Sequence, residues 1–230
     1  MKLLEKYRVL LFDLHGVIMF GHDRFGAQED FYRTYHALGG RRLSVDEVRR
    51  CITQCYEGMR ADYHNPARYD DFPSVREGLT RYGDAPADEL DLLEQVFSLH
   101  ECGLIPTECA ELLSRLSRTH RLGLVSNIWA PRYLWEREFE RAGISDVFSH
   151  VVFSSDGRSV KPSSKLFLEA LLGVHAAPED VLFVGDSVRC DMDGAKSLGM
   201  GTAWVSSLSE SYSSVDYRLS SVFELESLPV

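Results

Sequence analysis

Four short apolar runs in the sequence are each followed by side chains that can carry chemistry. These side chains are Asp13 and His15 after the first run, Ser126 and Asn127 after the second, Lys161 after the third, and Asp186 and Asp191 after the fourth. The set combines carboxylates, an imidazole, a hydroxyl, an amide and an ammonium group. Such a mixture is typical of a site where a nucleophile, a cation and an anionic substrate meet.

The carboxylates of this set indicate a nucleophile beside a metal ion. Asp13 can act as a nucleophile if its own charge and that of the substrate are offset. Asp186 and Asp191, five positions apart, offer the hard oxygen ligands that Mg²⁺ prefers. A bound Mg²⁺ would also neutralise the charge of a phosphate group. The sequence therefore predicts a carboxylate nucleophile next to a magnesium site.

The other groups are suited to holding a phosphoryl group. The hydroxyl and the backbone N–H groups at Ser126 and Asn127 can donate hydrogen bonds to phosphoryl oxygens. The Lys161 ammonium can pair both with Asp13 and with a phosphoryl oxygen. Together with the carboxylates, these groups are the equipment for phosphoryl transfer through an aspartyl-phosphate.

The apolar runs themselves are predicted to be strands of a parallel sheet. A short continuous apolar run is typical of a strand that is buried on both faces. The predicted strands cover 8–14, 122–126, 151–154 and 181–185, with a weaker fifth at 202–205. Helical patterns alternate with them over 106–116, 131–142, 162–172 and 193–198. This alternation predicts an α/β fold with helices on both faces of the sheet, and ligands in such folds bind at the carboxyl ends of the strands.

A long segment without strands separates the first two predicted strands. Residues 20–103 tolerate a helical interpretation over 25–38, 45–59, 75–82 and 87–100. Capping boxes at Ser44–Glu47 and Ser74–Glu77 mark two of the helix starts. An insertion of this length cannot be a loop, so we expect a helical subdomain over 20–103 and a core made of 1–19 and 104–230. Residues 220–224 suggest a last short helix.

The order and spacing of the motifs resemble those of the haloacid dehalogenase superfamily of hydrolases. The four matching segments are Phe12-Asp13-Leu14-His15-Gly16-Val17, Val125-Ser126-Asn127, Val160-Lys161-Pro162, and Val184-Gly185-Asp186-Ser187 continuing to Asp191-x-x-Gly194-Ala195. Each motif is weak by itself, whereas four in order on alternating strands are specific. The resemblance covers roughly 8–20 and 104–205, and implies a Rossmann-like core with a helical cap inserted after the first motif.

The resemblance also implies a role for each matched residue. Asp13 would be the nucleophile and a metal ligand. The backbone carbonyl of His15 and the carboxylate of Asp186 would be further ligands, with Asp191 in or just behind that shell. The transferred group would be held by Ser126, Asn127 and Lys161. The expected activity is Mg²⁺-dependent hydrolysis of a small phosphomonoester.

One position departs from the pattern of the family's phosphatases. They have Asp where this chain has His15, and that Asp protonates the leaving alcohol and then activates water. The imidazole of His15 could serve as the acid and base instead. Alternatively, His is longer than Asp, and because a misplacement of about 1 Å can cost about 100-fold in rate, the substitution disables turnover. A third interpretation makes the imidazole a metal ligand that shifts the preference toward Zn²⁺ or Mn²⁺.

These interpretations leave three functions open. The first is a working phosphatase, and the second is a catalytically impaired protein that binds a phosphoryl group or metabolite. The third is a metal-independent 2-haloacid dehalogenase, which would give no reason for both Asp186 and Asp191. Residues 20–103 contain no lysine. Family members that cleave phosphonates through a Schiff base on a cap lysine are therefore excluded.

Composition narrows the class of partner and the compartment. The 230 residues contain 25 Lys and Arg against 35 Asp and Glu, a net charge of −10. Such a chain repels nucleic acid and anionic lipid, so a small phosphorylated metabolite is the expected partner. There is no apolar stretch of membrane-spanning length and no signal-peptide pattern at the start. Five cysteines without a Cys-x-x-Cys motif favour a reducing cytoplasm, and the oligomeric state stays open.

Several other polar and aromatic residues have weaker signals. His22-Asp23 is interpreted as loop polarity because no further His/Asp set accompanies it. Ordinary surface charge accounts for Arg24, Arg60 and Arg68, although they could also bind an anion from the cap. For the aromatic pair beside the second motif, we expect Trp135 in the core and Trp129 at the cleft. We interpret Cys190 as a packing residue.

Overall fold

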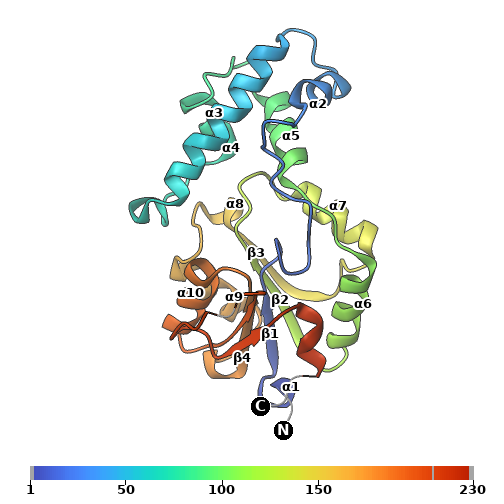
Figure 1. Ribbon diagram of the computed structural model, residues 1–230, viewed down its shortest axis with the longest axis vertical. Helices are drawn as coiled ribbons and strands as arrows, with labels where there is room; N and C mark the ends of the chain where they lie inside the picture. The colour runs from blue at the N-terminus through green and yellow to red at the C-terminus, as the bar shows by residue number, and fades with distance from the viewer. Residues whose placement is uncertain (1–2, 209, 228–230) are drawn as a thin grey trace.

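The computed structural model describes residues 3–208 and 210–227 and is built around a six-stranded parallel sheet (Figure 1). The strands are β1 (Val9–Phe12), β2 (Arg121–Ser126), β3 (Phe148–Phe153), β4 (Val181–Gly185), β5 (Gly201–Val205) and β6 (Tyr217–Leu219). Their order in the sheet is β3-β2-β1-β4-β5-β6, and every neighbouring pair is parallel. The chain runs outward from β1 on both sides, so β1 and β4 meet where the direction of winding reverses.

Both faces of the sheet are covered, because successive side chains of a strand point to opposite sides. Leu10 and Phe12 belong to one apolar cluster, together with side chains of helices α6 (Thr107–Leu116) and α7 (Tyr133–Ala142). Val9 and Leu11 belong to a second cluster with side chains of α9 (Ser164–Gly173) and α10 (Asp193–Ser197). Figure 1 shows these two helix pairs on opposite sides of the strands. The predicted α/β class is confirmed.

Most predicted elements are present, with shifted ends. All five predicted strands form, whereas the short edge strand β6 has no counterpart in the sequence prediction. The third helix of the core includes Gly173 instead of stopping before it. The helix expected at the end is a 3₁₀ turn over Val222–Glu226, and α1 (Leu3–Lys6), α8 (Ser154–Gly157) and a 3₁₀ turn at Pro178–Asp180 are short additions. No helix of the described residues is long and apolar enough to cross a membrane.

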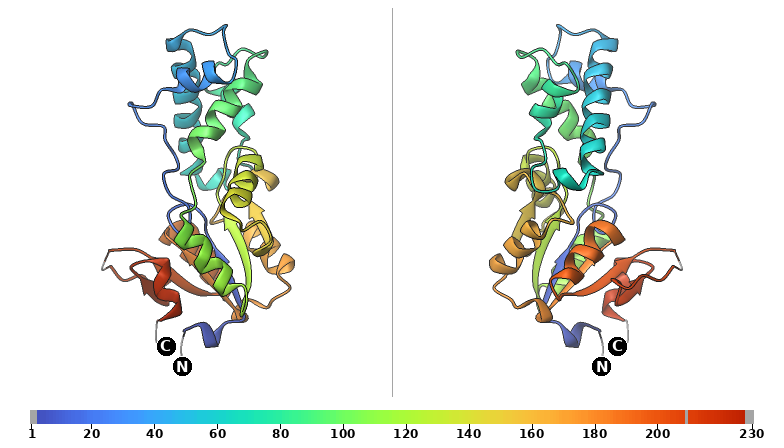
Figure 2. Two further views of the ribbon diagram at one scale, coloured as in Figure 1. Left: turned by 90° about the vertical axis from the view of Figure 1, so that its right-hand side faces the viewer. Right: turned by 90° about the vertical axis from the view of Figure 1, so that its left-hand side faces the viewer.

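A helical layer lies beyond the carboxyl edge of the sheet, at the top of Figures 1 and 2. It consists of α2 (Phe31–Ala37), α3 (Val45–Tyr63), a 3₁₀ turn at Pro66–Arg68, α4 (Val75–Arg81) and α5 (Leu90–Glu101). Both predicted capping boxes are present at the starts of α3 and α4. The helix expected over 25–38 is shorter, because the chain before Asp30 is a loop and Asp30 caps α2.

Two chain segments connect this helical layer to the sheet, and they pair with each other. Phe20 and Leu104 form an antiparallel bridge, each N–H donating to the other's carbonyl over 2.9 Å. Two further backbone bonds continue the pairing, from Asp23 to Glu101 (3.1 Å) and from Arg24 to His100 (2.8 Å). The sequence-predicted boundaries, 19/20 and 103/104, fall beside this bridge. Division into a separate core and cap stays a proposal.

The carboxyl group of Glu101 ties the end of α5 to the sheet. It accepts hydrogen bonds from the backbone N–H groups of Trp129 (2.6 Å) and Ala130 (2.8 Å), in the loop that follows β2. The side chain is buried. Burial, reinforced by the charge of Asp23, raises the pKa of Glu101 to about 8. One link between the helical layer and the sheet is therefore made by a carboxyl group that binds its proton in the pH range of the cell.

Replacing Glu101 with Gln should change how the stability of the protein depends on pH. Between about pH 4.5 and 8 the folded state keeps the Glu101 proton and the unfolded state releases it, so rising pH favours unfolding of the wild type. Glu101→Gln has no such proton. The difference in unfolding free energy, variant minus wild type, should therefore rise by roughly 1.4 kcal/mol per pH unit from pH 5.5 to 7.5.

Urea unfolding at several pH values measures this difference. Glu169→Gln, which changes an exposed carboxyl on α9, is the matched control and should follow the wild type. Loss of one backbone hydrogen bond in Glu101→Gln adds a constant offset, so only the slope counts. A difference that does not vary with pH would show that Glu101 ionises normally in the folded protein.

Candidate active site

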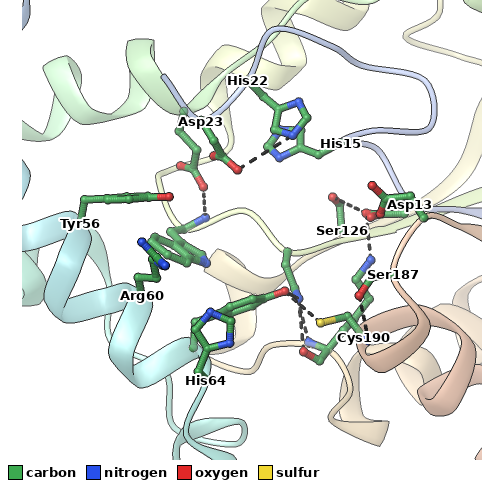
Figure 3. A pocket seen from close by; sticks show the side chains of 16 residues that line it. Asp13, His15, His22, Asp23, Tyr56, Arg60, His64, Ser126, Ser187 and Cys190 are labelled. Atoms are coloured by element: carbon green, nitrogen blue, oxygen red, sulfur yellow. Dashed lines mark hydrogen bonds and ion pairs between the residues drawn. The ribbon is translucent and has the colours of Figure 1, made fainter. Parts of the chain in front are cut away.

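The side chains predicted from the four motifs converge at the carboxyl edge of the sheet (Figure 3). Asp13 directly follows β1, and its N–H donates to the carbonyl of Val184 in β4 over 2.9 Å. Ser126 is the last residue of β2, and its hydroxyl donates to Oδ1 of Asp13 over 2.7 Å. Asp186 directly follows β4. Adjacent parallel strands thus deliver these groups to one point, as the spacing predicts.

The ammonium group of Lys161 is the electrostatic centre of the site. Its Nζ lies 2.8 Å from Oδ1 of Asp13 and 2.7 Å from Oδ1 of Asp191. It also donates to the carbonyl of Val125 over 2.9 Å, and the side chain is only 1% exposed. Burial by itself would lower the pKa of Lys161, but the two carboxylates outweigh it and raise the pKa above its usual value. Lys161 therefore stays charged between the two carboxyl groups.

Asn127 positions Lys161 through the backbone. Its Oδ1 accepts from the N–H of Lys161 over 2.7 Å, and its Nδ2 donates to the Lys161 carbonyl over 3.3 Å. The same Nδ2 donates to the hydroxyl of Tyr63, at the end of α3, over 2.9 Å. The amide of Asn127 is thus occupied by the chain around Lys161 and by the helical layer. The side chain of Asn127 therefore positions Lys161. The hydroxyl group beside the nucleophile is that of Ser126.

Three carboxyl groups lie close enough to share one cation. Asp13, Asp186 and Asp191 each offer an oxygen, and these oxygens lie within 4.8 Å of one another. Burial, together with the charges of Asp13 and Asp191, raises the pKa of Asp186 to about 7. The pKa of buried Asp191 is raised to about 6 for the same reason, with Lys161 acting in the opposite direction. The three carboxyl groups can carry more negative charge than the single positive charge of Lys161 balances. A divalent cation bound here would reduce their mutual repulsion.

Close backbone packing holds these carboxylates in place. Gly16 has a φ of +75°, and a Cβ at this position would lie 2.1 Å from Oδ2 of Asp186. A Cβ on Gly185 would lie 2.5 Å from the carboxyl group of Asp191. The N–H of Ser187 donates to Oδ2 of Asp191 over 2.9 Å. An all-oxygen set fixed in this way fits Mg²⁺, and the further predicted ligand, the backbone carbonyl of His15, stays a prediction.

The imidazole of His15 points away from the carboxyl group set and stacks on His22. The two ring centroids are 4.2 Å apart and the rings are inclined by 14° (Figure 3). The indole Nε1 of Trp135 donates to Nε2 of His15 over 3.3 Å. Burial, with the neighbouring His22 next in size, lowers the pKa of His15 to about 3 despite the charge of Asp13. His15 is therefore neutral at physiological pH.

The hydrogen bond from Trp135 decides which nitrogen of His15 carries the proton. Because Nε2 accepts, the proton of the neutral ring lies on Nδ1. The ring then has no free lone pair to bind a metal ion or to remove a proton from water. This geometry disfavours an imidazole ligand, and it leaves Nδ1–H as a hydrogen-bond donor rather than a strong acid.

A cavity of about 270 Å³ opens between the sheet edge and the helical layer. Its sheet side contains the predicted site residues, and its far wall is one face of α3 and the residue after it. That wall consists of Tyr56, Arg60, Tyr63 and His64. These residues stand at positions i, i+4, i+7 and i+8, so each lies three or four positions from another on the same face of the helix. This spacing is the only signal in the sequence that could have grouped them.

The cavity also corrects several weaker interpretations. His22 and Asp23 line it and are not merely polar loop residues. The three cap arginines differ in role. Arg24 donates to the carbonyls of Leu99 and Cys102, and Arg68 lies 3.3 Å from Asp71 and 3.5 Å from Asp62, whereas Arg60 reaches the cavity. Trp129 lines the cavity and Trp135 is fully buried, as predicted. Cys190 is buried at the cavity edge, with its Sγ 3.0 Å from the Tyr63 hydroxyl.

Known proteins with this combination of motifs and architecture are phosphatases and dehalogenases. The chain is 36% identical over 85 residues to a glyceraldehyde 3-phosphate phosphatase of Pyrococcus abyssi, covering 37% of this chain and 35% of that protein. It is 32% identical over 131 residues to a phosphoserine phosphatase of Thermus thermophilus, covering 56% of this chain and 52% of that one. The matches thus span about a third to a half of these relatives.

Among solved structures, the fold is similar to a HAD phosphatase from Thermococcus onnurineus. The TM-score is 0.65 at 24% identity, over 95% of this chain and 96% of that one. A 2-haloacid dehalogenase from Pseudomonas syringae has the same TM-score at 20% identity, over 96% of both chains. These likenesses concern the fold alone. A family profile described as haloacid dehalogenase-like hydrolase matches residues 7–199. The chain therefore belongs to the haloacid dehalogenase-like hydrolases.

Proposed function

We propose that this protein hydrolyses a small phosphomonoester through an aspartyl-phosphate on Asp13, with Mg²⁺ as cofactor. The observation that supports it most is the position of Lys161, whose ammonium lies between Asp13 and Asp191 while Asp186 completes a carboxyl set able to share one cation. Metal-independent dehalogenation is a weaker proposal, because without a metal only Asp191 has a role, as a partner of Lys161, and Asp186 has none.

The residues of this chain would divide the work as follows. A carboxylate oxygen of Asp13 attacks phosphorus while the bond from phosphorus to the alcohol oxygen breaks, and the leaving oxygen takes up a proton from water in the cavity. Lys161 and the Ser126 hydroxyl, both now bound to Oδ1 of Asp13, would stabilise the charge that develops on the phosphoryl oxygens. Water then attacks the aspartyl-phosphate, which releases inorganic phosphate and restores the Asp13 carboxylate. The helical layer keeps bulk water out of the cavity.

Bound Mg²⁺ would neutralise phosphoryl charge and help to orient the transferred group. The residues that would hold it are Asp13 and Asp186, with Asp191 in or just behind the shell and the His15 carbonyl as the remaining predicted ligand. The relatives named as phosphatases support a small phosphorylated substrate. A metabolite of the cytoplasm is in keeping with the acidic composition and the absence of a Cys-x-x-Cys motif.

The first test is the covalent step on Asp13. The wild type with Mg²⁺ should form a beryllofluoride adduct on Asp13 and release phosphate from p-nitrophenyl phosphate. Asp13→Asn should form no adduct and lose at least about 1000-fold in kcat, because an amide is a poor nucleophile. Mass spectrometry, ¹⁹F NMR and phosphate release measure these outcomes.

Asp193→Asn is the matched control, because it removes an exposed carboxylate at the start of α10 and should behave like the wild type. If the wild type shows neither an adduct nor turnover at any pH from 5 to 9, hydrolysis through Asp13 is the wrong function.

A second candidate function is binding without efficient turnover of natural substrates. It is favoured by the hydrogen bond from Trp135, which occupies Nε2 of His15 in the position where the family's phosphatases have their acid/base Asp. Alkyl phosphates need a proton for their leaving alcohol, whereas p-nitrophenolate leaves without one. The two candidates therefore differ in how the rate depends on the leaving group.

We expect kcat/KM for p-nitrophenyl phosphate to exceed that for alkyl phosphates by at least about 100-fold, because general acid catalysis typically contributes factors of about 100 to 10,000. His15→Asp should raise kcat/KM for the alkyl esters by at least about 10-fold and reduce the dependence on the leaving group. A series of phosphomonoesters with leaving-group pKa values from about 7 to 15 measures this. If His15→Asp instead abolishes activity on alkyl esters, histidine is the working acid and base.

A further inference from the structure

The cavity has a phosphoryl end and an opposite end with a different chemistry. Asp13, Ser126 and Lys161 lie at the sheet edge, where the phosphoryl group would be held. Tyr56, Arg60 and His64 face them from the helical layer, as Figure 3 shows. The wall at α3 therefore meets whatever the substrate carries beyond its phosphate.

The side chain of Arg60 has no protein partner among the described residues, although it lies in this wall. The two other arginines of α3 are engaged. Arg49 donates to the carbonyls of Ala27 and Glu29, and Arg50 donates to the carbonyl of Gly83 and lies 3.7 Å from Asp84. In the part of the chain that the structure describes, the side chain of Arg60 has neither a hydrogen bond nor an ion pair, whereas its backbone carbonyl accepts from the N–H of His64. Its guanidinium is free to bind a ligand.

The charge distribution of the cavity makes Arg60 the one permanent cation available to a second anionic group. Lys161, the other permanently charged cation among the described lining residues, is already shared between Asp13 and Asp191. Asp23 also lines the cavity and would repel an anion placed on its side. A substrate with a second negative charge can therefore be accepted only where Arg60 neutralises it.

We propose that Arg60 is a specificity-determining residue that binds a carboxylate on the leaving group, so that the substrates are small phosphorylated hydroxy acids. The guanidinium fork pairs with both oxygens of a carboxylate. One carboxylate balances the single charge of Arg60, whereas a second phosphoryl dianion would leave an excess negative charge in the cavity that Asp23 also lines. This assignment rests on the proposed function, because it assumes that the phosphoryl group binds at Asp13.

The size of the cavity limits the substrate further. A volume of about 270 Å³ is just below the usual range of ligand sites, which is about 300–1,000 Å³. The aromatic rings of Tyr56 and Tyr63 take up the rest of the α3 wall. A leaving group of a few carbon atoms and a carboxylate fits this space.

The test compares two ligands that differ only in the group at issue. 3-Phosphoglycerate carries a carboxylate where glycerol 3-phosphate carries a hydroxymethyl group. Their dissociation constants are measured by isothermal titration calorimetry with Mg²⁺ on Asp13→Asn, which removes the nucleophile so that neither ligand is consumed. The same measurement is made with Arg60→Gln, Arg60→Lys and Arg33→Gln added to Asp13→Asn. Arg33→Gln removes an equal charge from an exposed position on α2 that does not line the cavity.

We expect 3-phosphoglycerate to bind about 10- to 100-fold more tightly than glycerol 3-phosphate, as one charged hydrogen-bonded pair would give. Arg60→Gln should remove this preference, Arg60→Lys should keep part of it, and Arg33→Gln should leave it intact. Equal binding of the two ligands, or the same effect of Arg60→Gln and Arg33→Gln, would show that Arg60 is only a solvated surface residue. Tighter binding of propane-1,3-diol bisphosphate than of 3-phosphoglycerate would overturn the choice of a carboxylate.

The outcome is separable from that of the proposed function. Binding is measured without turnover, whereas the proposed function is read from phosphate release and the Asp13 adduct in the wild type. A carboxylate preference that depends on Arg60, in a protein that releases no phosphate, would support the specificity assignment and refute hydrolysis. Phosphate release without such a preference would support hydrolysis and refute the specificity assignment.

Discussion

The structure depends on one buried ammonium group held among carboxylates. Lys161 is nearly inaccessible to solvent, and only its contacts with Asp13 and Asp191 make a charge at that depth tolerable. Lys161 in turn opposes the rise that burial causes in the pKa of Asp191. Removing any one of the three would leave an unbalanced charge in the interior, so the chemistry of the site and the stability of the sheet edge are coupled.

Much of the surrounding polar structure serves to hold this charge cluster in place. Asn127 clamps the backbone on both sides of Lys161, and Ser126 donates to the oxygen of Asp13 that Lys161 also contacts. Tyr63 links Asn127 to the helical layer. Two hydrogen bonds, from Asn127 to Tyr63 and between Asn127 and Lys161, thus connect α3 to the phosphoryl end of the cavity. They offer a physical route by which ligand binding at α3 could affect the reacting groups.

His15 shows how an environment can change the chemistry of a residue type. A free imidazole titrates near physiological pH, but burial between His22 and Trp135 keeps this one neutral and fixes its proton on Nδ1. The family's phosphatases have a carboxyl group at this position. The packing around His15 therefore affects the mechanism more directly than the replacement of Asp by His does.

Sequence patterns alone predict the parallel sheet, the order of the motifs along the chain and the residues at the phosphoryl end of the site. Buried parallel strands are read from continuous apolar runs such as 181–185, and the residues after them must meet because parallel strands share one carboxyl edge. Asp13, Ser126, Lys161, Asp186 and Asp191 could thus be grouped without coordinates.

Two features depend on tertiary packing and could not be predicted from the sequence. They are the side chains of the helical layer that face the motif residues and the orientation of His15. Arg60 and Glu101 are distant in sequence from the motifs, and surface helices contain many similar charged residues. Which of them reaches the cavity depends on how α3 and α5 pack over the sheet. The partner of His15 Nε2 depends likewise on the packing of α7, a long-range contact that local patterns do not encode.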